Sequence, residues 1–211
     1  MVGEVGTLIL GLALAAALYA AFALFWGLRR GDDRWVQSGR NGIVSTAALL
    51  GFALLLLLFA FLTDHFEIRY VAQHSSRSLP VYLKASAVWA GQEGSLLLWS
   101  FLQALFAALL IRDRAEGRLR DWALVFLGVI TLFFTGVTLL LSNPFAWLDW
   151  VPADGQGLNP LLRHPGMIFH PPALYLGYVG LAVPYGLAMA ALVTGKVAGW
   201  TRVARRWTLA A

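Results

Sequence analysis

His170 is the side chain that its neighbours best prepare to bind a ligand. It stands before Pro171 and Pro172. Proline favours the first turn of a helix and moves the residue before it away from helical angles, so we predict a helix that begins at Pro171 with His170 directly ahead of it. A helix start stiffened by two prolines would hold the imidazole in one direction, which suits a metal ligand such as the axial ligand of haem iron. The alternative is a histidine that caps the helix through the backbone.

Glu93 is the second candidate, in the segment that begins at Trp89, and it is the one formal charge inside the long apolar stretches. A carboxylate in a membrane helix costs about 2.5–3.5 kcal/mol on insertion scales, so it usually faces a protein interior or water. Gly91 and Gly94 flank it and would allow another helix to come close. Glu93 is therefore either a functional carboxylate or a structural one near the outer end, bonded to the backbone or to an arginine.

These side chains need membrane-crossing helices to position them. The sequence is 59% hydrophobic and 13% charged, with a mean hydropathy of +0.70. A helix spans the bilayer core with about 20 apolar residues, and five stretches are long enough. We predict helices over residues 5–28, 41–63, 85–111, 122–142 and 171–194. The expected fold class is an all-α polytopic membrane protein in which residues 1–211 form a single transmembrane domain.

The charged loops predict which side of the membrane each end faces. The lysines and arginines number 16 and fall into four groups of four. Three groups are expected on one side: Arg29, Arg30, Arg34 and Arg40; Arg112, Arg114, Arg118 and Arg120; and Lys196, Arg202, Arg205 and Arg206. The fourth group, on the other side, is Arg69, Arg77, Lys84 and Arg163. By the positive-inside rule the N-terminus lies outside and the C-terminus in the cytoplasm, with outer loops over residues 64–84 and 143–170.

The composition excludes several kinds of chemistry. The sequence contains no cysteine, and so no thiol nucleophile, disulfide or thiolate metal site. The net charge is +5, but the basic residues cluster at helix ends, where they face lipid headgroups rather than nucleic acid. The four histidines, His65, His74, His164 and His170, all fall at or near the outer side, so none is placed mid-membrane as in a proton relay.

Five segments carry a family resemblance. They are residues 89–99 (WAGQEGSLLLW), 142–145 (SNPF), 154–162 (DGQGLNPLL), 168–183 (IFHPPALYLGYVGLAV) and 206–211 (RWTLAA). Together they resemble the CcmF family, the membrane haem-handling subunits of cytochrome c maturation, which are related to CcsA-type haem proteins and NrfE. The match runs in order along the whole chain, and its Glu-Gly-Ser and His-Pro-Pro motifs are specific.

The resemblance implies a function that residue spacing alone does not give. Such proteins hold haem at the outer face of the membrane, under a tryptophan-rich WWD domain, with two outer histidines as axial ligands. The histidine of the His-Pro-Pro motif maps onto His170. The haem, b-type before attachment, comes from the chaperone CcmE and is joined by thioethers to apocytochrome c, with a CcmH-type subunit as partner. The implied place is the bacterial inner membrane, with the functional face towards the periplasm.

The sequence departs from the family pattern in two places. It stops at Ala211, so the WWD domain, the second outer histidine and the histidines of an intramembrane haem b are absent from it. Gln92 stands where family members often have histidine, and no role of that histidine is carried over. We therefore expect the N-terminal five-helix part of a cytochrome c haem lyase, which is incomplete as an enzyme by itself.

Two other functions remain open at this point. One is a proton- or ion-coupled transporter subunit in which Glu93 is the coupling group, although no broken-helix repeat is evident. The other is a non-catalytic membrane subunit that assembles other chains. Trp89, Pro171 and Pro172 join Glu93 as residues to which we assign a structural or functional role beside His170.

Overall fold

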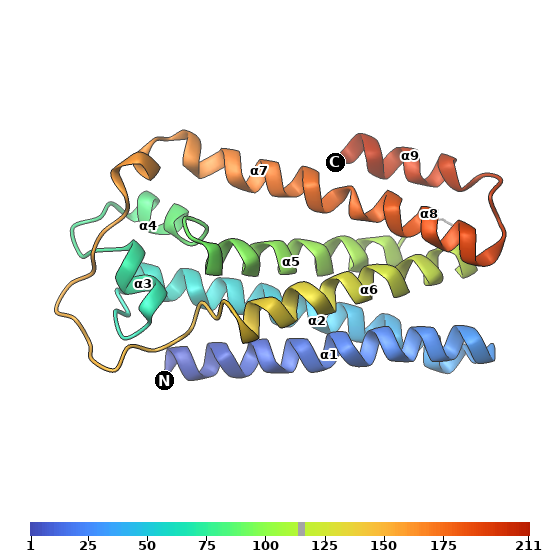
Figure 1. Ribbon diagram of the computed structural model, residues 1–211, viewed down its shortest axis with the longest axis horizontal. Coiled ribbons are helices and arrows are strands. Elements are labelled where there is room, and N and C mark those ends of the chain that lie inside the picture. The colour runs from blue at the N-terminus through green and yellow to red at the C-terminus, as the bar shows by residue number, and fades with distance from the viewer. Residues whose placement is uncertain (114–116) are drawn as a thin grey trace.

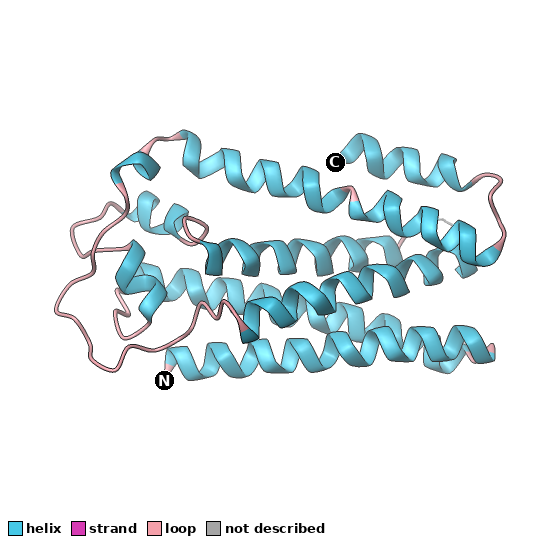
Figure 2. Cartoon of the chain, viewed as in Figure 1, coloured by secondary structure: helices cyan, strands magenta, loops and turns pink. Residues whose placement is uncertain are grey.

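The chain folds into a bundle of long helices that are apolar enough to cross a membrane. The computed structural model describes residues 1–113 and 117–211 (Figure 1; Figure 2). Within these, the five candidate spans are α1 (Val2–Arg30), α2 (Asp33–Leu62), α5 (Gln92–Ile111), α6 (Gly117–Leu140) and the pair α7 (Gly166–Gly180) and α8 (Ala182–Thr194). The expected all-α membrane fold with five spans is confirmed. Arg114, which entered the loop charge count, lies outside the described residues.

Shorter helices fill the connections. α3 (Arg69–His74) and α4 (Val81–Ala87) lie between α2 and α5, and the short 3-10 helix η1 (Pro160–Arg163) precedes α7. The last helix is α9 (Trp200–Ala210). We call the end of the bundle that carries α3, α4 and η1 the loop end. The opposite end, where α1 joins α2 and α5 leads to α6, is the basic end (Figure 1).

The helices α2 and α6 begin well before the residues that the hydropathy pattern predicts. α2 begins at Asp33 and α6 at Gly117, whereas residues 41 and 122 were expected. Gly31 turns the chain with a φ of 69°, in the left-handed region that glycine enters without strain. The Asp32 carboxylate then accepts the backbone N–H of Arg34 at 2.9 Å and caps α2. Polar first turns thus belong to these helices, although they lie outside the apolar runs.

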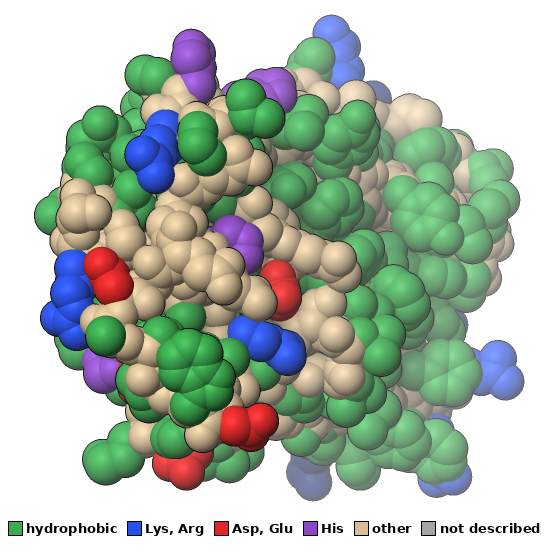
Figure 3. All heavy atoms as spheres, turned by 60° about the vertical axis from the view of Figure 1, so that its left-hand side comes forward, with side chains coloured by type: hydrophobic (Ala, Val, Ile, Leu, Met, Phe, Trp, Pro, Cys, Tyr) green, Lys and Arg blue, Asp and Glu red, His purple; other side chains and the backbone are tan. Residues whose placement is uncertain are grey.

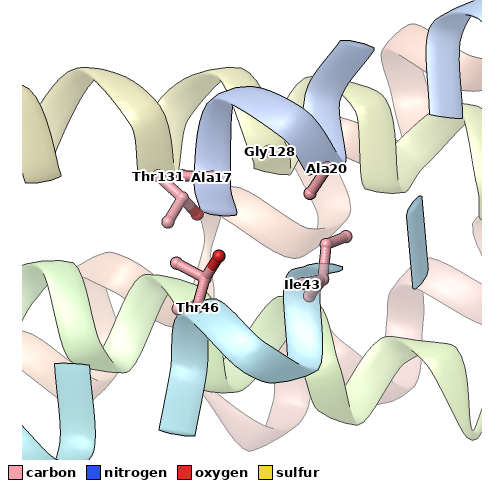
Figure 4. A pocket seen from close by; sticks show the side chains of 7 residues that line it. Ala17, Ala20, Ile43, Thr46, Gly128 and Thr131 are labelled. Carbon is pink, nitrogen blue, oxygen red and sulfur yellow. The ribbon is translucent and has the colours of Figure 1, made fainter. Parts of the chain in front are cut away.

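Small residues let the long helices pack closely. α1 packs against α2 and α6, α5 packs against the same two helices, and α8 packs against α6. An added Cβ at Gly42 of α2 would lie 2.9 Å from the Cβ of Ala20, so glycine permits the approach of α1. A cavity of about 10 Å³ remains at the centre, lined by Ala17, Ala20, Ile43, Thr46, Ala104, Gly128 and Thr131 (Figure 4). The Thr46 hydroxyl donates to the carbonyl of Gly42 in its own helix at 2.9 Å, so it needs no partner there.

An ion pair ties α2 to α6 near the basic end. The Arg40 guanidinium donates to both carboxylate oxygens of Asp121, at 3.0 Å from Nε and 2.6 Å from Nη2. The Asp121 side chain is only 6% exposed. A buried carboxylate needs such a two-pronged partner, because an unpaired charge in a protein interior is strongly destabilising. Arg40 therefore belongs to the contact between two helices and not to an open loop.

At the loop end, the two predicted outer loops pack against each other. The Arg69 N–H donates to the Ala146 carbonyl at 2.8 Å, and the Leu148 N–H donates to the Glu67 carbonyl at 3.0 Å. Phe145, the residue before Ala146, is fully buried, with its ring against Gly6 of α1. Figure 3, with the loop end turned forward, shows histidine side chains on a largely apolar and uncharged surface that also carries Lys, Arg, Asp and Glu side chains. The segments form one layer with short helices, rather than two open loops.

The third predicted helix, over residues 85–111, is in fact two helices. α4 ends at Ala87, and α5 begins only at Gln92. Gly91, between them, has an extended backbone with φ −120° and ψ 177°. The whole stretch is apolar enough for one helix, and hydropathy does not register the turn that interrupts it.

The fifth span and the end of the chain also differ from the prediction. The span is divided at Leu181, close to Pro184, which has no N–H to donate to the carbonyl of Gly180. α9 then turns back along the bundle (Figure 1). An added Cβ at Gly180 would lie 2.8 Å from the Cβ of Ala211. The last residue therefore lies beside α7.

Candidate functional site

His170 lies inside a helix, not ahead of one. α7 begins at Gly166, so His170 is its fifth residue, and the predicted start at Pro171 is wrong. The imidazole is exposed and makes no hydrogen bond with any described residue. Leu174 and Tyr178 follow it by one and two turns on the same helix face, and both are exposed. The ring is therefore open to a ligand near the loop end, beside an apolar face of α7.

The histidine that bonds to the start of α7 is His164, one residue before the N-cap Pro165. Its Nδ1 accepts the backbone N–H of Gly166 at 3.0 Å, which satisfies one of the N–H groups left unpaired at a helix start. The alternative role considered for His170, a cap bonded to the backbone, is thus filled by a different histidine. His170 has no such structural task in the described part of the chain.

The two prolines inside α7, Pro171 and Pro172, leave backbone carbonyls without their usual helical donors. Pro171 has no N–H to offer the carbonyl of Met167, four residues before it. The indole N–H of Trp89 donates to this carbonyl instead, at 3.0 Å. Trp89 lies in the turn between α4 and α5, so the bond links that turn to the helical turn that carries His170.

Further contacts fix α7 to α5. The carbonyl of Trp89 accepts the Ser95 hydroxyl at 3.0 Å, which ties the turn to the first residues of α5. The Trp89 ring is half-buried against the core of the loop end. Deeper in the bundle, the rings of Trp99 and Tyr175 lie 5.6 Å apart. Because α7 is held to α5 at two levels, the direction of its first turns is well defined.

Glu93 lies in the first turn of α5, at the loop end. It is half-buried, and its carboxylate makes no hydrogen bond or ion pair with any described residue. A carboxylate in the first turn interacts favourably with the helix dipole. This position, at the end of the bundle rather than halfway along it, favours a role at the loop end over ion transfer through the bundle.

Gly91 and Gly94 make room for Tyr70 and the preceding turn, and not for another long helix. A Cβ at Gly94 would lie 1.7 Å from the carbonyl oxygen of Val88 and 2.7 Å from the hydroxyl oxygen of Tyr70. That hydroxyl accepts the Gly91 N–H at 2.9 Å and lies 3.1 Å from the Val88 carbonyl, to which it donates. Burial raises the pKa of Tyr70 above its ordinary value, and the nearby Glu93 carboxylate acts in the same direction. The phenol therefore stays protonated and can donate.

The sequence pattern missed Tyr70, and it did not connect His74 with the turn at Gly91. The His74 Nδ1 lies 3.0 Å from the Tyr70 carbonyl, which can only accept, so Nδ1 carries the proton. A Cβ at Gly91 would lie 2.7 Å from His74 Nε2. The approach of His74 to Gly91 depends on how α3 packs against the turn, and no spacing within one segment reports that.

The side chains around His170 suit haem iron better than a metal ion that is held by protein ligands alone. Among the described residues, no group of three or more His, Cys, Asp or Glu side chains could hold a metal ion. A protein-ligated ion such as structural zinc needs about four such donors. Haem iron brings four nitrogens of its own and asks the protein only for axial ligands. One open imidazole beside an apolar surface is therefore compatible with haem.

The region that contains these residues matches a known protein family. The family model described as "Cytochrome C assembly protein" matches residues 89–209. The chain belongs to this family. The match begins at Trp89 and includes Met167 and His170, so the hydrogen bond between Trp89 and Met167 and the candidate ligand His170 all lie within it.

Relatives within the cytochrome c assembly family extend well beyond this chain. It is 39% identical over 216 residues to "Cytochrome c-type biogenesis protein CcmF" of Haemophilus influenzae, a match that covers 100% of this chain and 33% of the relative. The Pseudomonas aeruginosa protein of the same name is 41% identical over 215 residues, with the same coverage. A solved structure, "Cytochrome c Heme Lyase CcmF", has a TM-score of 0.86 at 31% identity and covers 99% of this chain and 33% of its own. The chain thus spans about a third of the length of these relatives.

Proposed function

We propose that this chain is the haem-holding N-terminal part of a CcmF-type cytochrome c haem lyase, and that His170 supplies one axial ligand to the haem iron. The observation that carries the proposal is the exposed imidazole of His170. It lies on the helical turn whose Met167 carbonyl accepts a hydrogen bond from Trp89. Membership in the cytochrome c assembly family supports the same function.

Haem is the substrate here, held for a time and then passed on. The protein would provide an imidazole to the iron and an apolar surface to the macrocycle. Leu174 and Tyr178, exposed on the helix face of His170, are suited to the second task. The vinyl groups that form thioethers belong to the haem, so the residues of this chain orient the haem and set the ligation of its iron.

The proposal includes a direction across the membrane. By the positive-inside rule the basic end faces the cytoplasm and the loop end faces the periplasm of a bacterial inner membrane. His170 then opens to the side where the chaperone CcmE would deliver haem and a CcmH-type subunit would present apocytochrome c. In this proposal the chain supplies one axial ligand, and the rest of the lyase supplies the second.

A haem titration in detergent, followed by the Soret absorbance, tests the proposal. We expect the wild-type chain to bind haem with a histidine-ligated spectrum, and His170→Ala to lose that spectrum. The matched control is His164→Asn, which removes another loop-end imidazole but keeps a side chain able to cap α7. Equal titrations for wild type and His170→Ala would refute ligation by His170.

The rival function, a non-catalytic membrane subunit, makes a different prediction in cells. If the chain only assembles other subunits, His170→Ala should leave both complex assembly and haem attachment intact. If His170 holds haem, the complex should still assemble while covalent attachment to cytochrome c is lost. The exposed position of His170 makes the variant suitable, because the substitution removes no described hydrogen bond.

A further inference from the structure

Two adjoining clefts open at the basic end, outside the site described above. The first has a volume of about 490 Å³ and lies between α1, α6 and α8. Its lining residues are Leu28, Arg29, Arg118, Trp122, Val193, Thr194 and Lys196. The second, of about 540 Å³, shares Leu28, Arg29 and Arg118 with the first and extends over the turn between α1 and α2.

The first cleft is basic. Arg29 and Arg118 line it, and none of the described residues in its lining is acidic. Arg29 and Arg118 are exposed, and they border both clefts. The acids of the second cleft are Asp33 and Asp121, of which Asp121 is already held by Arg40 in a two-pronged ion pair. An excess of positive charge therefore remains around Arg29 and Arg118.

The wall of the first cleft is apolar on the side of the bundle. It is made by Leu28, Trp122 and Val193, and Val193 is 50% exposed. Trp122 is fixed by edge-on packing against Phe25, with ring centroids 6.0 Å apart. A small soluble anion needs only the basic rim of such a cleft. A phospholipid uses both parts, because its phosphate lies at the ends of the spanning helices and its chains lie along their apolar sides.

We propose that the first cleft binds the phosphate headgroup of an anionic phospholipid, with Arg29 and Arg118 as the two main contacts. The two residues come from the last turn of α1 and the first turn of α6, so a bound headgroup bridges two spans. The site is independent of haem handling, since the start of α6, which carries Arg118, and the start of α7, which carries His170, lie at opposite ends of the bundle (Figure 1).

Native mass spectrometry of the detergent-purified chain tests this site. Phosphatidylglycerol and phosphatidylcholine with identical acyl chains serve as probes. We expect the wild type to retain phosphatidylglycerol, and Arg29→Gln/Arg118→Gln to retain it at least about tenfold more weakly, given the contribution of each basic residue near a membrane surface. The matched control is Arg202→Gln/Arg205→Gln, which removes the same charge from exposed positions on α9 that line neither cleft.

The outcomes separate the possible sources of binding. Equal losses in the two double variants would overturn the proposal, because they would mean diffuse attraction to net charge. Equal retention of phosphatidylcholine would overturn it as well. Displacement of phosphatidylglycerol by equimolar glycerol phosphate would show a site for a soluble phosphate and not for a lipid. Thermal unfolding in neutral detergent should be unchanged in both variants, which confirms that a loss of lipid is not a loss of fold.

Discussion

The indole N–H of Trp89 donates to the carbonyl of Met167 at 3.0 Å, across 78 residues of sequence. Met167 lies four residues before Pro171, which cannot make the helical hydrogen bond to that carbonyl. The tryptophan thus occupies the position that proline vacates, and it fixes the turn of α7 that carries His170. Trp89 and His170 are thereby coupled through one backbone group.

Replacing Trp89 with phenylalanine should weaken this coupling while keeping most of the ring packing. The loss of one hydrogen bond and the unpaired Met167 carbonyl should lower the free energy of unfolding by roughly 1–3 kcal/mol. We also expect weaker haem binding in the Soret titration, because the direction of His170 is less fixed. Trp150→Phe is the control, since Trp150 is 69% exposed at the same end of the molecule. Equal haem affinity in both variants would argue against a positioning role for Trp89.

Tyr70→Phe removes the hydroxyl that joins α3 to the turn before α5. The partly buried Gly91 N–H loses its acceptor, and the buried Val88 carbonyl loses a donor. We expect a loss of stability of about 1–3 kcal/mol, measured by chemical denaturation in detergent. Tyr82→Phe, at an exposed tyrosine of α4, should change stability by far less. A Tyr70→Phe variant as stable as the wild type would show that the hydroxyl contacts are dispensable.

Gly94→Ala should be among the most damaging single-methyl substitutions in the chain. The added Cβ would lie 1.7 Å from the Val88 carbonyl oxygen, which is backbone and cannot rotate away. Overpacking of this kind costs about 1–3 kcal/mol and sometimes more. Gly11→Ala is the matched control, because an added Cβ there meets nothing within 4 Å. Thermal unfolding of the two variants should differ clearly, and equal melting temperatures would contradict the close packing at Gly94.

The spans and their order could be predicted from the sequence because each is a long apolar run, a property that residues carry individually. The polar first turns of α2 could not, since Asp32 and Arg34 dilute the hydropathy signal although the Asp32 cap is itself a sequence feature. The start of α7 was misplaced for another reason. The rule that proline begins a helix ignores a donor from elsewhere in the chain, and Trp89 is such a donor.

The candidate site, too, could be predicted from the sequence only in part. His170 and Trp89 were both singled out from their motifs, but the bond that relates them is a tertiary contact that no local pattern contains. His164 as the histidine bonded to the start of α7, and Tyr70 as the occupant of the space beside Gly94, also became visible only from the packing of separate segments. Residue type indicates what a side chain can do, whereas its partners depend on the fold.

The contact between residues 64–84 and residues 143–170 at the loop end should weaken in acid, because Asp154 forms part of it. Its carboxylate accepts the N–H of Arg77 at 2.8 Å and that of Gly155 at 2.7 Å, and these bonds, the one from Arg77 foremost, lower its pKa from the ordinary value of 3.8. A lowered folded pKa means that the contribution of Asp154 to stability is present above 3.8 and is lost as the pH falls through the lowered value. The amide NMR signals of Arg77 and Gly155 should therefore titrate with a midpoint below 3.8. A midpoint at or above that value would contradict the assignment.

The most direct measurement of the central claim is a ligand exchange at His170. The sequence contains no cysteine, so His170→Cys introduces a single thiol. If His170 is an axial ligand, haem bound to the variant should change from a histidine-ligated to a thiolate-ligated Soret and electron paramagnetic resonance spectrum. A thiolate alters these spectra only when its sulfur coordinates the iron. A haem complex of His170→Cys with the spectrum of the wild type would show that the iron is held elsewhere.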